Sequence, residues 1–241
     1  MSSFSVSFLV AAKDESVSLE KTVDFVMENC DKRDIDKIII VIPSTAAPEC
    51  LETIEKLEKR YPENVVRLVQ KRPHLGGAIH DAADFAVSTH VMLLSADMSV
   101  DLRPLPDMID KEKQNPGGIV KTSRWLKKGS FFDYPKLLLF ANASAQAFLR
   151  LLYGAKLTDM TAPVQIMPLE LYRKIDWKEQ GYAALPELIL CPLRLGAEFI
   201  EVPAECYQRT EGSSGNSLMQ RSTYLKTALR IRFTKPQKLL K

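Results

Sequence analysis

The chain has 241 residues, of which 46% are hydrophobic and 26% are charged, and its formal net charge is +3. These values are typical of a globular protein with a substantial core, and the small net charge gives no reason to expect nucleic acid as a partner. The length suits one α/β domain spanning residues 1–241, because sheets that alternate strands with helices commonly reach this size.

Strand and helix signals alternate along the first 125 residues. Short apolar runs predict strands at 4–12, 37–43, 65–69, 90–96 and 118–123, and helical spacing of apolar residues predicts helices at 15–30, 48–61, 76–87 and 105–114. This alternation predicts mainly parallel strands joined by right-handed crossovers, and hence a three-layer α/β sandwich.

The second half of the chain has a different pattern. It begins with a long, strongly apolar helix candidate at 134–153. After it we expect a loop at 157–163, a helix at 183–195, a strand at 198–204, a Ser/Gly-rich loop at 210–217 and a terminal helix. No stretch has the composition of a linker and no period repeats, which again favours one domain.

Cysteine usage and the two ends of the chain bear on location. Cys30, Cys50, Cys191 and Cys206 are far apart and lack metal-binding or disulfide spacing, which fits a reducing compartment. The N-terminus has no signal-peptide pattern, and no run approaches the roughly 20 apolar residues of a membrane span. From Gly212 onward all charged residues are cations. We therefore expect a cytoplasmic protein whose tail either contacts the inner face of an anionic membrane or is simply solvated.

Ligands of such sheets bind beyond the carboxyl ends of the strands, and three polar segments follow predicted strands. Asp97 can ligate a divalent cation there, or can cap the next turn. Lys71 and Gly76 precede a helix, where amides can bind phosphate, although a solvated turn has the same pattern. Arg209 can bind phosphate oxygens in bidentate fashion, but its segment alone is typical of any surface loop.

Taken together, these segments resemble the motifs of family 2 glycosyltransferases, specifically the polyprenyl-phosphate (dolichyl-phosphate-mannose-type) sugar synthases. The resemblance covers residues 4–233, nearly the whole chain. The matching segments are LVAAKDE at 9–15, HLGGA at 74–78, LSAD at 94–97, TSR at 122–124, LTDMT at 157–161, IEVP at 200–203 and RTEGSS at 209–214. The last two are the most specific, because an apolar strand that ends in E-V-P before R-x-x-G-x-S is uncommon.

The resemblance implies a GT-A fold, which is a Rossmann-like nucleotide-diphospho-sugar transferase sandwich with a mainly parallel central sheet. It also implies inverting transfer of a hexose from a nucleoside diphosphate sugar to a polyprenyl phosphate or glycan acceptor. Residues 1–125 would form the nucleotide-sugar-binding half and residues 126–241 the acceptor-binding half. The helix at 134–153 would lie against lipid, assisted by the basic tail, although a helix in the domain core fits its composition equally.

By position, the resemblance implies that Asp97 is the catalytic residue and that Asp97 and Ser99 are the metal ligands. Glu15 would hold the nucleoside, and Arg124 would bind phosphate. The full set of implied donor-binding residues is Ala12, Lys13, Asp14, Glu15, Ser44, Lys71, Gly76 and Asp97. The implied acceptor-binding or phosphate-binding residues are Arg124, Asp159, Arg209 and Ser214.

Several motif positions depart from the family pattern. Ser95 replaces the first Asp of D-A-D, Ser44 lies where a paired Asp is expected, and Gly215 replaces a lysine. Because carboxylates are lost, we expect weak or absent binding of Mg²⁺ or Mn²⁺.

Two hypotheses fit these departures. Either a cation such as Lys13 partly replaces the metal charge at the diphosphate, or the chain is a non-catalytic GT-A scaffold that partners another transferase. A sugar-nucleotide pyrophosphorylase fits less well, because residues 11–14 do not form the Gly-rich basic loop that such enzymes need.

Overall fold

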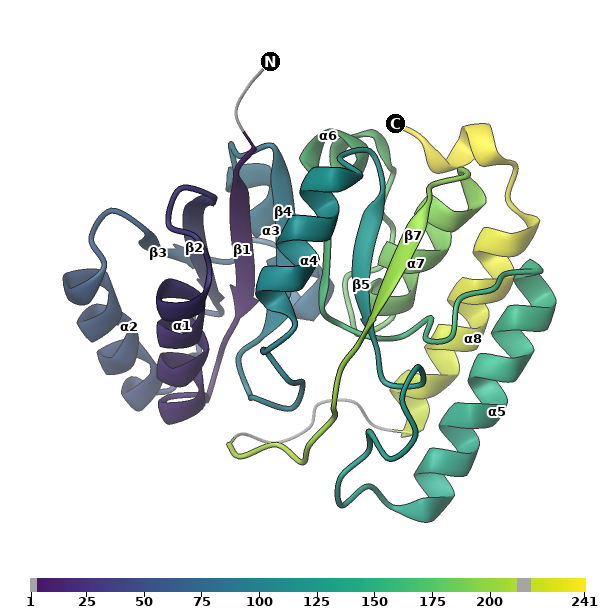
Figure 1. The fold of residues 1–241 in the computed structure, drawn as a ribbon, viewed down its shortest axis with the longest axis horizontal. Coiled ribbons are helices and arrows are strands. Elements are labelled where there is room, and N and C mark those ends of the chain that lie inside the picture. Colours follow the sequence, from purple (N-terminus) through teal and green to yellow (C-terminus); the bar gives the residue numbers. More distant parts are fainter. Residues whose placement is uncertain (1–3, 212–217) are drawn as a thin grey trace.

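The computed structural model describes residues 4–211 and 218–241, with the side chains of 218–221 left out of the description. The strands are β1 (Val6–Ala11), β2 (Ile35–Ile42), β3 (Val65–Val69), β4 (His90–Ser95), β5 (Ile119–Ser123), β6 (Gln165–Pro168) and β7 (Phe199–Pro203). Within the described residues they form one sheet in the order β3-β2-β1-β4-β6-β5-β7 (Figure 1).

The sheet is mainly parallel, as the alternation of strands and helices predicts. Among the strands described, only β6 runs against its neighbours, β4 and β5. The carboxyl ends of β1, β4, β5 and β7 therefore lie along one edge of the sheet. The sequence did not predict β6 or the short helix that follows it, because four strand residues and a six-residue helix are too short to show a period.

The helices are α1 (Val17–Asn29), α2 (Pro48–Arg60), α3 (His74–Phe85), α4 (Leu105–Gln114), α5 (Lys136–Tyr153), α6 (Leu169–Lys174), α7 (Ala184–Arg194) and α8 (Leu218–Phe233), with a 3₁₀ turn at Pro236–Leu239. Helices α1, α2 and α4 contribute to the core on one face of the sheet, and α3, α6 and α7 to the core on the other. This arrangement confirms the predicted three-layer α/β sandwich.

The central strands are apolar at successive positions because both faces of the sheet are covered. In β1, Phe8 and Val10 belong to the core beneath α1, while Leu9 between them belongs to the core beneath α3. All three are essentially inaccessible to solvent. A strand covered on both sides reads as a continuous apolar run, which is why the sequence predicts β1, β2 and β4 so clearly.

Helices α5 and α8 lie side by side beyond the β7 edge of the sheet (Figure 1). The Tyr153 hydroxyl of α5 donates to the Ala228 carbonyl oxygen of α8 at 2.7 Å. Of the α5 residues, all of which the structure describes, only Gln146 and Leu149 are buried. The alternative that this apolar helix belongs to the domain core is therefore wrong, and the tertiary structure leaves most of its surface exposed.

The C-terminal cations whose side chains the structure describes divide into two groups. Arg230 forms ion pairs with Glu187 at 2.6 Å and Glu179 at 3.1 Å, and Arg232 donates to the Leu152 carbonyl oxygen at 2.7 Å. Lys226, Lys235, Lys238 and Lys241 are exposed. No helix in the described part of the chain is both long enough and apolar enough to cross a bilayer.

Candidate active site

A cleft of about 980 Å³ opens at the carboxyl edge of the sheet. Its charged lining comes from the segments that follow β1, β4, β5 and β7, and consists of Glu15, Asp97, Arg124 and Arg209 among the described residues. We call these four residues the polar floor. Because strands with a common direction present their carboxyl ends at one edge, residues from four distant segments of the chain meet in one place.

Asp97 lies in the turn after β4 and lines the cleft, although only 2% of its surface is exposed. Its Oδ1 accepts hydrogen bonds from the Ser95 hydroxyl at 2.5 Å and from the Ser99 amide at 3.0 Å. Met98 adopts a left-handed φ of 55°, which turns the chain sharply between these donors. The turn therefore fixes Asp97 with one oxygen engaged by its own loop.

The other oxygen of Asp97 meets Arg209, whose Nε lies 2.9 Å from Oδ2. Arg209 belongs to residues 204–211, which follow β7 and which we call the strap. Several backbone hydrogen bonds anchor the strap, among them Tyr207 N–H to Ser99 O at 2.9 Å and Cys206 N–H to Ser130 O at 2.7 Å. The strap thus carries a guanidinium to the end of β4.

Glu211 ties the far end of the strap to the start of α1. Its carboxylate accepts hydrogen bonds from the amides of Ser16 and Ser18, each at 2.9 Å, and from Val17 at 3.2 Å. Burial acts to raise the pKa of Glu211, but these hydrogen bonds and that from the Ser18 hydroxyl outweigh burial and lower it to about 2. An anion at a helix N-terminus satisfies unpaired amides and the helix dipole together.

The other residues assigned to the donor lie around the first two strands. Glu15 lines the cleft, and its Oε2 accepts hydrogen bonds from the amides of Lys13 at 2.8 Å and Asp14 at 3.1 Å. The Lys13 and Asp14 side chains are exposed and form a weak pair at 4.0 Å. Ala12 is buried, whereas Ser44 is exposed. Glu15 is thus the member of this group that the structure brings to the polar floor.

Lys71 and Gly76 lie outside the cleft lining. Lys71 is exposed, and its backbone N–H donates to Asp81. A Cβ placed on Gly76 would lie 2.5 Å from the Glu179 carbonyl oxygen and 2.8 Å from the Ala184 Cβ. Gly76 therefore permits close packing of α3 on the chain before α7, and that packing fills the space where the sequence suggested a ligand.

Arg124 and Asp159 form a bidentate ion pair behind the cleft. Arg124 Nε lies 2.7 Å from Asp159 Oδ2, and its Nη2 lies 2.9 Å from Oδ1. Arg124 also lines the cleft, whereas Asp159 is completely buried. Burial acts to raise the pKa of Asp159, but the charge and hydrogen bonds of Arg124 and the charge of Lys121 hold it well below its usual range. Asp159 therefore orients the Arg124 guanidinium from the buried side, away from the cleft.

Two further charged residues complete this network, and the sequence analysis gave neither a role. Lys121 is fully buried on β5, with its Nζ 3.5 Å from Glu201 Oε1 and 2.8 Å from the Thr122 carbonyl oxygen. Glu201 on β7 accepts hydrogen bonds from the amides of Thr158 at 2.7 Å and Asp159 at 3.0 Å. A lysine within an otherwise buried strand was the available signal, because such a residue needs charged partners.

Gln146 is the polar residue that links this network to α5. Its Nε2 donates to the Thr161 hydroxyl at 2.9 Å, and its Oε1 accepts from the Met160 amide at 2.8 Å. A single glutamine in the middle of an apolar helix was a signal that one side of α5 faces polar groups. Ser214, the remaining residue assigned to phosphate, lies outside the described residues.

Much of the remaining lining of the cleft is apolar, although uncharged polar residues such as Asn142, Thr161 and Tyr182 also contribute. One side of α5 contributes residues spaced three and four apart, which is the spacing of a single helix face. We call this group, with its neighbours from α7 and α8, the apolar wall: Leu138, Ala141, Ala145, Phe148, Leu149, Leu185, Pro186 and Leu225. The cleft therefore combines charged groups at the sheet edge with an apolar surface built by the second half of the chain.

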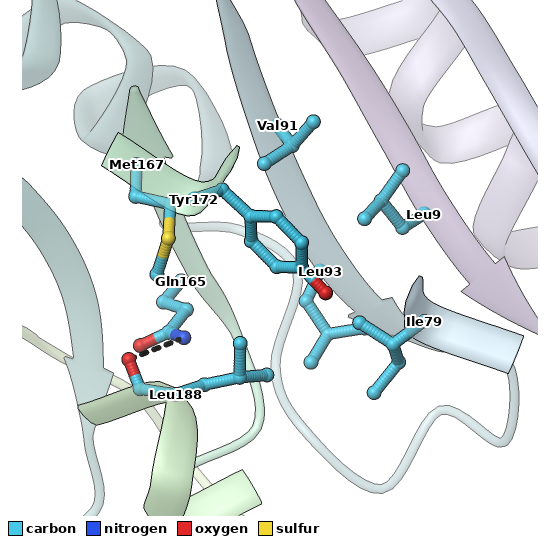
Figure 2. A pocket seen from close by; sticks show the side chains of 8 residues that line it. All are labelled: Leu9, Ile79, Val91, Leu93, Gln165, Met167, Tyr172 and Leu188. Carbon is cyan, nitrogen blue, oxygen red and sulfur yellow. Dashed lines mark hydrogen bonds between the residues drawn. The ribbon is translucent and has the colours of Figure 1, made fainter. Parts of the chain in front are cut away.

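A second, much smaller cavity lies within the core between the sheet and helices α3, α6 and α7 (Figure 2). Its volume is about 10 Å³, barely the room that one water needs. Gln165 lines it and donates through Nε2 to the Leu188 carbonyl oxygen at 3.4 Å. This cavity is too small for a substrate, so the large cleft is the candidate site.

The polar floor is a poor fit for a divalent metal. Asp97 has hydrogen-bond or ion-pair partners on both oxygens, and Ser95 and Ser99 add no charge. In the residues that the structure describes, no group of three or more His, Cys, Asp or Glu could hold a metal ion. Hard cations such as Mg²⁺ are held mainly by carboxylates and substrate phosphates. A metal at Asp97 would have to displace Arg209 and compete with Ser95.

Comparison with known proteins agrees with this architecture. Residues 7–176 match the model of the family described as glycosyl transferase family 2. The crystal structure of glucosyl-3-phosphoglycerate synthase from Mycobacterium tuberculosis with Mn²⁺, UDP and phosphoglyceric acid is 15% identical, with a TM-score of 0.72 over 96% of this chain and 80% of that chain. The complex of the same enzyme with UDP is 18% identical, with a TM-score of 0.69 over 96% and 81%.

A further crystal structure, described as that of a mycobacterial protein, is 16% identical, with a TM-score of 0.67 over 96% of this chain and 76% of that chain. At such low identity these likenesses show a common fold. The predicted GT-A architecture is thereby confirmed.

Proposed function

The chain belongs to glycosyl transferase family 2, and from this membership we propose that it transfers a hexose from a nucleoside diphosphate sugar to a lipid phosphate acceptor with inversion at the anomeric carbon. One observation carries the proposal: a single cleft holds both the polar floor and the apolar wall. A donor diphosphate requires cations, and a lipid chain requires an apolar surface of some length. The cleft offers both within one volume.

The donor side of the proposal uses residues 1–125, with Glu15 near the nucleoside and Asp97 and Arg209 near the diphosphate. Positions past the carboxyl ends of parallel strands are where nucleotides bind in sheets of this kind. The fold neighbour described above was crystallised with UDP and Mn²⁺, which supports a nucleoside diphosphate sugar as the donor. Positioning and charge compensation at the leaving diphosphate would then supply most of the rate enhancement.

The acceptor side uses residues 126–241. A polyprenyl phosphate would lay its chain along the apolar wall and turn its phosphate toward Arg124. In the reaction, an oxygen of the acceptor phosphate forms the new bond to the anomeric carbon as the bond to the nucleoside diphosphate breaks. A single displacement of this kind inverts the anomeric centre. Because the acceptor oxygen is already anionic, no general base has to remove a proton.

The proposal extends to a membrane surface. On α5, Leu137 is 78% exposed and Leu151 is 85% exposed, and neither belongs to the apolar wall. The exposed lysines Lys226 and Lys235 come from the neighbouring C-terminal segment. Apolar side chains beside cations are typical of peripheral contact with anionic lipid. We infer a protein that works at the cytoplasmic face of a membrane.

Product formation tests the proposed function directly. The purified protein is incubated with UDP-, GDP- and dTDP-hexoses labelled in the sugar, together with a polyprenyl phosphate, either with Mn²⁺ or with a chelator. We expect label in the lipid phase and, by NMR of the product, an inverted anomeric configuration. Asp97→Ala should lower turnover by about 100-fold or more. The matched control is Asp107→Ala, because Asp107 is an exposed aspartate on α4.

The acceptor class has its own test. Ala145→Trp would place a large side chain in the part of the cleft beside the apolar wall. We therefore expect the KM for a long polyprenyl phosphate to rise, while the KM for a short-chain phosphate stays unchanged. Equal KM changes for both acceptors would contradict the lipid assignment. Nucleotide-sugar binding without any turnover would favour the scaffold hypothesis. Absence of both binding and turnover under every condition would reject the function altogether.

A further inference from the structure

We propose that Arg209 supplies the positive charge that holds the donor diphosphate, in the role that a divalent metal has in related enzymes, and that Asp97 positions its guanidinium. This inference rests on the proposed function and concerns the same cleft. Two observations support it: the polar floor is a poor fit for a metal, and Asp97 forms an ion pair with Arg209.

The first argument is the coordination of Asp97. Oδ1 accepts from Ser95 at 2.5 Å and Oδ2 lies 2.9 Å from Arg209 Nε, so both oxygens already face donors. The side chain is only 3% exposed beneath Arg209 and its own loop, so Mg²⁺ with the waters that it normally retains would have to displace Arg209 to reach it. A carboxylate in these surroundings suits a fixed cation of the protein better than a hydrated ion.

The second argument is the placement of Arg209. The strap is held by Tyr207 N–H to Ser99 O at 2.9 Å on one side and by Glu211 at the start of α1 on the other. Arg209 therefore sits between two anchored points, and its side chain is still 32% exposed where it lines the cleft. A planar guanidinium offers donors in a fork that matches phosphate oxygens. Its pair with Asp97 fixes the direction of that fork.

The third argument is the position of the other cations. Arg124 donates through Nε and Nη2 to Asp159 and through Nη2 to Thr161 at 2.9 Å, and the proposed function already assigns it to the acceptor phosphate. Lys13, which one of the two hypotheses from the sequence named as a partial substitute for metal charge, has a side chain that is 57% exposed and pairs weakly with Asp14. It is absent from the described lining of the cleft, whereas Arg209 is part of it. Arg209 is therefore the better candidate.

Calorimetric titration of the full chain with UDP, GDP and dTDP, each with EDTA and with MnCl₂, tests the inference. We expect the preferred nucleotide to bind equally well in both buffers. Arg209→Ala should weaken binding roughly 10- to 100-fold in both, because a hydrogen-bonded charge is lost and Mn²⁺ has no site from which to replace it. Arg33→Ala is the control for net charge, because Arg33 is exposed and pairs only locally with Asp31 among the described residues.

Asp97→Asn separates the two roles of the aspartate. If Asp97 held a metal, this variant would lose nucleotide binding. If Asp97 positions Arg209, the variant should retain binding or bind more tightly, because the guanidinium no longer shares its charge with a carboxylate, while turnover falls. The double variant Asp97→Asn/Arg209→Ala should bind as weakly as Arg209→Ala, which shows that loss of the cation, and not exposure of Asp97, is responsible.

The outcomes are distinct. Binding by the unaltered protein that requires Mn²⁺, bound Mn²⁺ detected by electron paramagnetic resonance in the absence of nucleotide, or unchanged binding by Arg209→Ala would each overturn the inference and leave the proposed function intact. If no nucleotide binds to the unaltered protein in either buffer, the proposed function fails and the inference fails with it. Circular dichroism and the melting temperature verify that each variant is folded.

Discussion

Among single residues, the buried ion pair of Arg124 and Asp159 predicts a large effect on stability. Asp159 is inaccessible to solvent and compensates both Arg124 and the buried Lys121. Asp159→Asn would leave the buried Arg124 without its charged partner and Lys121 with Glu201 alone, so we expect it to lower the free energy of unfolding by about 3–5 kcal/mol. Urea denaturation followed by circular dichroism measures the loss.

The control for this variant is Asp107→Asn. Asp107 pairs with Lys111 one helical turn away, and both side chains are more than a third exposed. Exposed pairs of this spacing contribute about 0.3–0.5 kcal/mol. An Asp159→Asn protein as stable as Asp107→Asn would show that the buried network does not depend on its charge.

Glu211 predicts a pH dependence. Its pKa of about 2 in the folded protein lies below the value of about 4.3 expected for an unfolded chain. A carboxyl group with a lowered pKa stabilises the fold above its unfolded pKa and loses that contribution as the pH falls toward its folded pKa. The contribution of Glu211 should therefore be complete at neutral pH and decline between about pH 4.5 and about pH 2.

Glu211→Gln measures that contribution. At neutral pH we expect the variant to be less stable by about 1 kcal/mol, the usual value of a capping interaction at a helix start. At about pH 3 the difference between the two proteins should be much smaller. Glu55→Gln, at an exposed position of α2, is the control. A difference that stays constant with pH would contradict the assignment of the lowered pKa to Glu211.

Among the helices, α3 packs closely against the chain before α7 because Gly76 has no side chain. A methyl group on Gly76 would meet the backbone oxygen of Glu179 at 2.5 Å, and a backbone cannot move aside as a flexible side chain can. We expect Gly76→Ala to destabilise the protein by about 1–3 kcal/mol. Gly117→Ala is the matched control, because nothing lies within 4 Å of the point where its methyl group would be. Thermal unfolding gives the melting temperatures of Gly76→Ala and Gly117→Ala. Equal values would contradict the close contact at Gly76.

For the molecule as a whole, we expect the exposed leucines of α5 and the exposed C-terminal lysines to bind anionic vesicles together. Leu137→Asp/Leu151→Asp should reduce co-sedimentation with phosphatidylglycerol vesicles at least ~10-fold, because each buried leucine contributes about 1.5–3 kcal/mol. Binding should also weaken as salt is raised. Val87→Asp is the control, since Val87 is 81% exposed in the turn before β4, at the end of that strand opposite the cleft. Equal vesicle binding by both variants would refute a membrane-facing α5.

Most of the architecture could be predicted from the sequence. Continuous apolar runs such as that of β2 and helical spacing such as that of α2 depend on near neighbours in the chain, so they predicted the elements and, from their alternation, a mainly parallel sheet. Asp97 could be placed at the carboxyl edge of the sheet because it directly follows β4, a strand that the local sequence predicts. Strand β6 and helix α6 were not predicted, because four strand residues and six helix residues repeat their periods too few times to be recognised.

Which charges face each other became visible only in the folded chain. Asp97 and Arg209 are more than 100 residues apart in the chain, and no local pattern specifies that the strap returns to the end of β4. The same holds for Lys121 and Glu201, and for the exposure of α5, whose composition suited a core helix equally well. Hydrophobic periodicity is a local property, whereas the pairing of buried charges depends on how distant segments close around one site.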